Sequence, residues 1–215
     1  MKADYHLHTS FSSDSDTEPE IMIKKAIELG LQTHLADVYT NLLSYYDFDF
    51  AIGSVHLVNR IDPYYPEFFE GRSSYEAYME YFEAVLSNLD AYTGYDVFGH
   101  IDYIFRYGPD SDCFKFDYKV YGDILDAILN KIISNDLGIE LNTAGFKYGL
   151  NHPNPHEDII RRYKELGGEI ITVGSDGHRP EHMAYDFHKV KDILISCGFN
   201  HYNRFDKRKA IAIDI

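Results

Sequence analysis

The sequence predicts an α/β fold in which short strands alternate with longer helices around a mainly parallel sheet. Short apolar segments rich in β-branched residues are separated by longer segments with helical spacing. Polar residues that can bind metals follow five of the expected strands. This second pattern favours a closed barrel over an open sheet, because a (β/α) barrel brings its strand ends together at one active-site face.

The expected strands are short and mostly end in polar residues. They span residues 3–7, 49–55, 96–100, 138–142 and 169–173, with a weak last strand at 209–213. The expected helices span residues 18–29, Ser73 or Ser74 to Leu89, 118–135, 155–166 and 180–196. Thr17 is suited to cap the first helix. Pro155 suits the first turn of the fourth, and Gly198 lies near the end of the fifth.

Composition and charge narrow the possible functions. The 215 residues fit one domain over 1–215, and 20 Lys+Arg against 35 Asp+Glu give a net charge of −15, which argues against binding nucleic acid. No apolar run reaches the roughly 20 residues of a membrane span, and the N-terminus lacks the pattern of a secretory signal. Cys113 and Cys197 lie far apart and form no disulfide framework. We therefore expect a reduced cytoplasmic protein.

Metal-competent side chains follow the five strands, in a chain that contains 11 histidines. They are His6 and His8, His56, His100 and Asp102, Asn142, and Asp176 and His178. Side chains two apart on a strand point the same way, so each H-x-H or D-x-H pair can reach one cation. A single such motif is weak, since a histidine at a strand end is usually a hydrogen-bonded polar residue. Together they predict a site for Zn, Mn or Fe.

The motifs resemble those of the PHP (polymerase and histidinol phosphatase) family of metal-dependent phosphoesterases, in the family's order and over nearly the whole chain. The histidinol-phosphatase branch is the most similar. The matching motifs are His6-Leu-His8, Gly-Ser-Val-His56, Phe-Gly-His100-Ile-Asp102, Ile-Glu-Leu-Asn142 and Gly-Ser-Asp176-Gly-His178. The resemblance implies a distorted (β/α) barrel that holds two to three divalent metals at the strand ends.

The resemblance also implies the metal ligands. His6, His8 and Asp176 would hold the first metal together with a bridging glutamate. His56 and His100 would share that glutamate and hold the second metal. Asp14 and His178 would belong to a third site.

One region departs from the family pattern. The chain passes almost directly from Leu29-Gly30-Leu31 to the Ser-Val-His strand, and it contains no T-D-H motif. We therefore expect fewer than seven strands. Residues 26–31 match either the end of the first family helix or the segment that carries the bridging glutamate. Glu28 is accordingly a bridging ligand or a helix-surface residue, and His34 is a weaker candidate for a replacement ligand.

The implied activity is hydrolysis of a small phosphorylated substrate, L-histidinol phosphate, to L-histidinol and phosphate in histidine biosynthesis. Asp176 and His178 would lie at the reacting phosphate as ligand or proton donor. Arg106 could clamp the phosphate, or it could be an ordinary surface arginine. Arg179 and Lys147 are weaker candidates for the same role.

Other interpretations remain open. The lost T-D-H motif favours a degenerate domain that binds metal without catalysis, although the later motifs are all present. An amidohydrolase-like barrel also opens with H-x-H, but Asn142 does not fit it. A shortened barrel would leave an open sheet edge with unpaired backbone groups. A second copy of the chain could cover this edge, so we expect a homodimer. His152 and His156 flank a proline-rich turn, and we expect them to face solvent, or one of them to line the site.

Overall fold

The computed structural model describes residues 26–108 and 116–215. Five parallel strands form its main sheet and lie side by side in chain order. They are β1 (Ala26–Gly30), β2 (Phe50–Ser54), β3 (Val97–Phe98), β4 (Gly138–Asn142) and β5 (Ile171–Gly174). The α/β class with a parallel sheet is confirmed, and the described sheet has fewer than seven strands.

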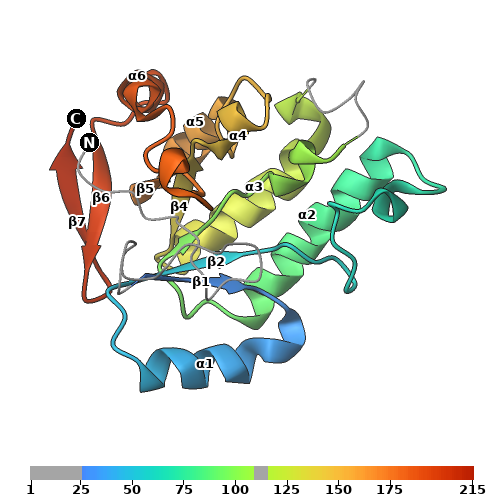
Figure 1. Ribbon diagram of the computed structural model, residues 1–215, viewed down its shortest axis with the longest axis horizontal. Helices are drawn as coiled ribbons and strands as arrows, with labels where there is room; N and C mark the ends of the chain where they lie inside the picture. Colours follow the sequence, from blue (N-terminus) through green and yellow to red (C-terminus); the bar gives the residue numbers. More distant parts are fainter. Residues whose placement is uncertain (1–25, 109–115) are drawn as a thin grey trace.

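Helices follow the strands and cover the outside of the sheet (Figure 1). They are α1 (Ala36–Tyr45), α2 (Ser74–Ala91), α3 (Tyr118–Ser134), α4 (Ala144–Lys147), α5 (Glu157–Glu165) and α6 (Val190–Ser196). In α3, Leu125, Ile128 and Ile132 are fully buried at helical spacing, as predicted. Ser73 begins α2 with a capping box, because its side chain and that of Glu76 each accept the other residue's backbone N–H. No helix in the described ranges is long and apolar enough to cross a membrane.

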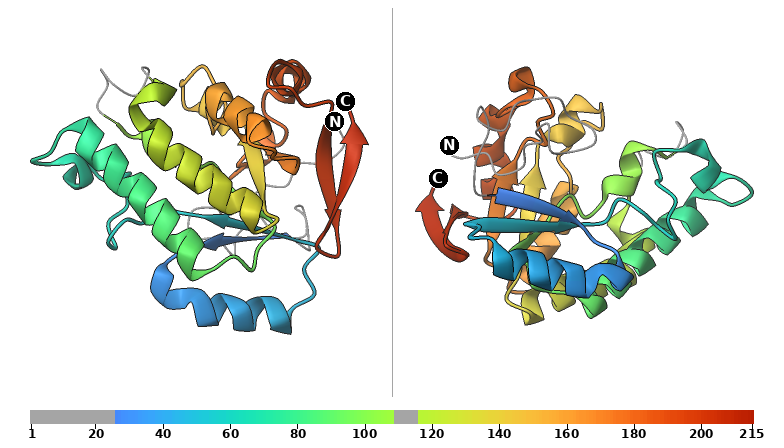
Figure 2. Two further views of the ribbon diagram at one scale, coloured as in Figure 1. Left: turned by 180° about the vertical axis from the view of Figure 1, so that it is seen from behind. Right: turned by 60° about the horizontal axis from the view of Figure 1, so that its bottom comes forward.

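A two-stranded antiparallel hairpin, β6 (His201–Asp206) and β7 (Lys209–Asp214), stands at the side of the sheet away from α2 (Figure 2). Arg208, in the turn of this hairpin, hydrogen-bonds Asp96, which lies just before β3. The Asp96 carboxylate accepts hydrogen bonds from Ala51 N at 2.7 Å and from Arg208 Nε at 2.6 Å. Asp96 therefore joins β2, the segment before β3 and the hairpin.

The helix predicted over residues 18–29 is wrong in its last part, since residues 26–30 form β1; residues 18–25 lie outside the described ranges, as does the expected strand 3–7. The reason is tertiary pairing. β1 runs parallel to β2, every residue of which is buried. Pairing with a buried strand outweighs local helix propensity. The same result excludes a helix-surface position for Glu28, because Glu28 lies on a strand.

The helix predicted over residues 180–196 is also wrong in its first half. Residues 180–182 and 187–189 form separate 3₁₀ turns, and only Val190–Ser196 is α-helical. Ala184 and Asp186 have φ values of 53° and 54°, which cannot belong to a right-handed helix. Three of the helices and strands in the described ranges were not predicted, namely α1, α4 and β6. The remaining boundaries differ by a few residues; α5, for example, begins at Glu157 rather than Pro155.

Candidate metal centre

Three polar side chains from consecutive strands meet at the C-terminal edge of the sheet. Glu28 lies on β1, His56 follows β2 by two residues, and His100 follows β3 by two residues. Glu28 Oε1 lies 3.2 Å from His100 Nε2 and 3.6 Å from His56 Nε2. One ligand atom from each residue lies within 4.8 Å of the other two. We call Glu28, His56 and His100 the triad.

Local backbone and side-chain contacts orient the triad. Ser54 Oγ donates to Glu28 Oε1 at 2.6 Å and fixes this carboxylate against the end of β2. His100 has a φ of 26°, although it is not glycine, and its side chain is 1% exposed. Residues held at positive φ cost free energy and concentrate at functional sites. Two imidazoles and a carboxylate within reach of one point form a ligand set suited to Zn²⁺, Mn²⁺ or Fe²⁺.

Polar side chains of the fourth strand, β4, make hydrogen bonds at this edge of the sheet. Glu140 is fully buried on β4, and its Oε2 accepts from His100 N at 3.3 Å and from Asn142 Nδ2 at 3.1 Å. Asn142 Oδ1 in turn accepts from Ala144 N at 2.9 Å, at the start of α4. The side chain of Asn142, predicted at a strand end, thus hydrogen-bonds Glu140 and the chain that leaves the strand.

Arg106 is buried, so it is not a surface arginine. Its side chain is 2% exposed, and Nη1 donates to Asp176 Oδ2 at 2.7 Å while Nε donates to Asn154 Oδ1 at 2.9 Å. Asn154 Nδ2 donates to Asp102 Oδ1 at 2.6 Å, which extends the network into the core. Burial alone would lower the pKa of Arg106. The charge of Asp176 and the phenol of Tyr107 outweigh that effect, so the pKa is raised and the guanidinium stays charged.

The third guanidinium nitrogen of Arg106, Nη2, differs from Nε and Nη1 in its hydrogen bonding. Nη2 is buried and has no hydrogen-bond partner within the described residues. A buried cationic N–H without an acceptor is costly, and it is satisfied when an anionic oxygen reaches it. Two rings hold the guanidinium in place, since its Cζ lies 4.8 Å from the ring centroid of Tyr148 and 5.3 Å from that of Tyr103. The tyrosines, Asn154 and the role of Asp102 were not identified from the sequence.

Other predicted residues gather around Asp176, which has a φ of 51°. His178 Nδ1 lies 3.0 Å from the backbone oxygen of Asp176 and 3.6 Å from its Oδ1. Lys147 Nζ donates to the same backbone oxygen at 3.1 Å. Arg179 is exposed. Tyr103 links this group to the triad, because its ring centroid lies 5.2 Å from that of His100.

The remaining predicted ligands and histidines divide into two groups. His6, His8 and Asp14 lie outside the described residues. His34 is exposed and His152 is buried, so the expectation that His152 faces solvent is wrong. His156 is partly buried and caps α5, where its Nδ1 accepts from Asp158 N at 3.1 Å. Burial and then the neighbouring His152 lower the pKa of His156, which fits an accepting, neutral imidazole.

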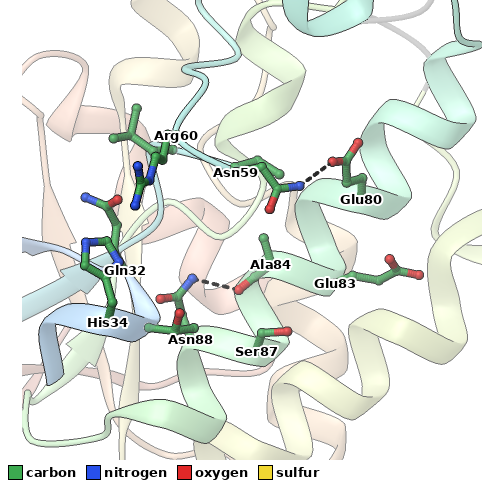
Figure 3. A pocket seen from close by; sticks show the side chains of 12 residues that line it. Gln32, His34, Asn59, Arg60, Glu80, Glu83, Ala84, Ser87 and Asn88 are labelled. Atoms are coloured by element: carbon green, nitrogen blue, oxygen red, sulfur yellow. Dashed lines mark hydrogen bonds between the residues drawn. The ribbon is translucent and has the colours of Figure 1, made fainter.

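A pocket of about 420 Å³ lies beside the triad's strands, between α2 and the segments that follow β1 and β2 (Figure 3). Its lining includes His34 and Arg60 on one wall and Glu80 and Glu83 on the other. Glu80 already accepts a hydrogen bond from Asn59 at 2.8 Å and forms an ion pair with Arg72. The pocket contains no triad residue.

Comparison with known proteins gives three consistent findings. A family model described as PHP domain matches residues 33–144. The histidinol-phosphatase of Lactococcus lactis subsp. lactis is 30% identical over 199 residues, covering 91% of this chain and 72% of that protein. A Clostridium acetobutylicum protein named "Probable histidinol-phosphatase" is 30% identical over 175 residues, covering 80% of this chain and 67% of that protein.

A solved structure extends the similarity to the fold. It is the histidinol phosphate phosphatase of Lactococcus lactis subsp. lactis, in complex with Zn, L-histidinol and phosphate. It superimposes on this chain with a TM-score of 0.83 at 25% sequence identity, covering 97% of this chain and 98% of that one.

Proposed function

Since this chain belongs to the PHP domain family, we propose that it is a metal-dependent phosphomonoesterase that converts L-histidinol phosphate to L-histidinol and phosphate. The observation that carries the proposal is the triad, because Glu28, His56 and His100 offer one ligand atom each within 4.8 Å of one another. Ligand atoms this close together suit a single divalent cation. The relative that binds Zn, L-histidinol and phosphate supports the choice of substrate.

Zn, Mn or Fe would occupy two to three sites in this proposal. The triad would hold one, with Glu28 as the bridging carboxylate. His6, His8, Asp14, Asp176 and His178 are proposed as the other ligands on the strength of the family resemblance. When bound, such cations provide a nucleophilic water at neutral pH and offset the negative charge of the phosphate.

The chain's own residues would orient the phosphate. Arg106 stays charged between two tyrosine rings, and Nη2 is the donor left for a phosphate oxygen. Asn154 and Asp176 hold the guanidinium plane through Nε and Nη1. His178 lies beside Asp176 and is proposed to donate a proton to the leaving alcohol or to bind metal. Lys147 and Arg179 would add positive charge around the same position.

The first experiment is phosphate release from L-histidinol phosphate, measured with added Mn²⁺ or Zn²⁺ and repeated with EDTA. We expect turnover that requires metal and is lost with the chelator. Folded protein that binds Mn²⁺ or Zn²⁺ but releases no phosphate would refute the proposal in favour of the degenerate metal-binding domain.

Two further features belong to this proposal. We propose that the enzyme acts in the cytoplasm with reduced cysteines, and Cys197 is a free, buried thiol. We also propose a homodimer that covers a sheet edge. The monomer mass is 24.9 kDa, so light scattering that gives this mass at micromolar concentration would refute the dimer.

A further inference from the structure

Aromatic rings extend outward from the triad in an unbroken series. The ring centroid of Tyr103 lies 5.0 Å from that of His56. Tyr107 follows at 5.1 Å from Tyr103, and Tyr64 follows at 5.6 Å from Tyr107. Tyr64 is 62% exposed, whereas Tyr103 is 7% exposed, so the series leads from the metal centre to the surface. We call Tyr64, Tyr103 and Tyr107 the tyrosine wall.

The Asp62 carboxylate accompanies this wall. Asp62 is partly buried, and its Oδ1 accepts from Tyr64 N at 2.8 Å. Burial is the main reason that the pKa values of Tyr103 and Tyr107 are raised; the charge of Asp62 raises them further, and the charge of Arg106 lowers them. Burial also raises the pKa of Asp62, and no cationic side chain of the described residues offsets this. Withdrawing a carboxylate from water without a cationic partner costs free energy.

We propose that Asp62 and the tyrosine wall bind a positively charged group on the organic part of the phosphate ester, and so select cationic over neutral phosphomonoesters. The inference rests on the proposed function, because it assumes that the phosphate lies at Arg106. Tyr103 lies between the phosphate position and the rest of the wall. Its ring centroid is 5.3 Å from Cζ of Arg106 on one side and 5.1 Å from the ring centroid of Tyr107 on the other. A substrate whose phosphate reaches Arg106 can therefore extend its organic part along the wall.

The chemistry of the wall fits an organic ammonium or imidazolium group. Faces of tyrosine rings attract cations, and they do so more strongly where water is excluded. A carboxylate that has lost part of its hydration recovers free energy when a cation pairs with it. The amine of L-histidinol is such a cation, whereas the alcohol of p-nitrophenyl phosphate carries no positive charge.

The test compares two substrates in two variants. Asp62→Asn removes the charge but keeps an oxygen that can accept from Tyr64 N, so the loop retains its hydrogen bond. Glu67→Gln is the matched control, because Glu67 is an exposed carboxylate on the neighbouring 3₁₀ turn Pro66–Phe69. We measure kcat and KM for L-histidinol phosphate and for p-nitrophenyl phosphate.

We expect Asp62→Asn to lower the ratio of kcat/KM for L-histidinol phosphate over p-nitrophenyl phosphate about 10- to 100-fold, mainly by raising KM for the cationic ester. Glu67→Gln should leave the ratio unchanged. An unchanged ratio in Asp62→Asn would overturn the inference, because a merely structural role lowers both activities together.

A binding measurement separates this inference from the proposed function. Isothermal titration of the metal-loaded wild-type protein with L-histidinol should give a lower Kd than titration of Asp62→Asn, by the same factor. If the wild-type protein hydrolyses neither ester, the proposed function fails, and this titration still decides the inference. Equal Kd values for L-histidinol would overturn it.

Discussion

Replacement of Arg106 tests how far the buried guanidinium contributes to catalysis. In the wild-type protein its Nε and Nη1 make hydrogen bonds of 2.9 Å and 2.7 Å, and Nη2 remains for the substrate. Loss of one hydrogen bond to a charged group costs about 1.5–3 kcal/mol. We therefore expect Arg106→Ala to lower kcat/KM for L-histidinol phosphate about 10- to 150-fold.

The alanine variant also affects folding. Asp176, whose side chain is 4% exposed, loses its arginine partner, and removal of one member of a buried ion pair costs about 3–5 kcal/mol. Arg106→Lys separates the two effects, because lysine keeps a positive charge near Asp176 but lacks the planar fork. We expect Arg106→Lys to remain folded in urea titrations and to lose at least about 10-fold in kcat/KM. Wild-type kcat/KM in a folded Arg106→Lys protein would refute the proposed phosphate contact.

Two further predictions follow from other parts of the structure. Glu28→Gln keeps the shape of the side chain but removes the negative charge of the triad. The purified variant should therefore contain at least one metal equivalent less than the wild-type protein, as measured by mass spectrometry. Glu83→Gln, which changes an exposed carboxylate, is the control and should keep the wild-type metal content. Equal metal content in the two variants would contradict this. Arg208→Ala should lower the free energy of unfolding by about 1–3 kcal/mol, because buried Asp96 loses a charged donor. Arg208→Ala should leave kcat/KM unchanged, and an unaltered urea midpoint would show that the contact does not stabilise the hairpin.

The sequence predicted the parallel sheet and most of the strand ends because hydrophobic periodicity and polar strand ends are local signals. The segment 26–30 shows the limit of such signals. Its residues are compatible with a helix, and only pairing with buried β2 makes them a strand. Glu28 could therefore be named as a candidate ligand while its location remained undecided.

The surroundings of the site could not be predicted for a similar reason. Arg106 is polar and follows a short motif, so the sequence does not reveal that it is enclosed. Its partner Asn154 is 48 residues away along the chain. The capping role of His156 and the burial of His152 likewise depend on how a proline-rich turn packs. Contacts between distant segments have no local pattern.

The attachment of the hairpin to Asp96 has a consequence for how the chain folds. The strands of the sheet pair in chain order, so each βα unit can add to the one before it during synthesis. The Arg208–Asp96 contact is different, because it joins residues 112 positions apart. Contacts of such high sequence separation form late, since the loop that they close costs entropy. Until then the Asp96 carboxylate lacks its arginine, so we expect docking of the hairpin against β2 and the segment before β3 to be among the last steps of folding.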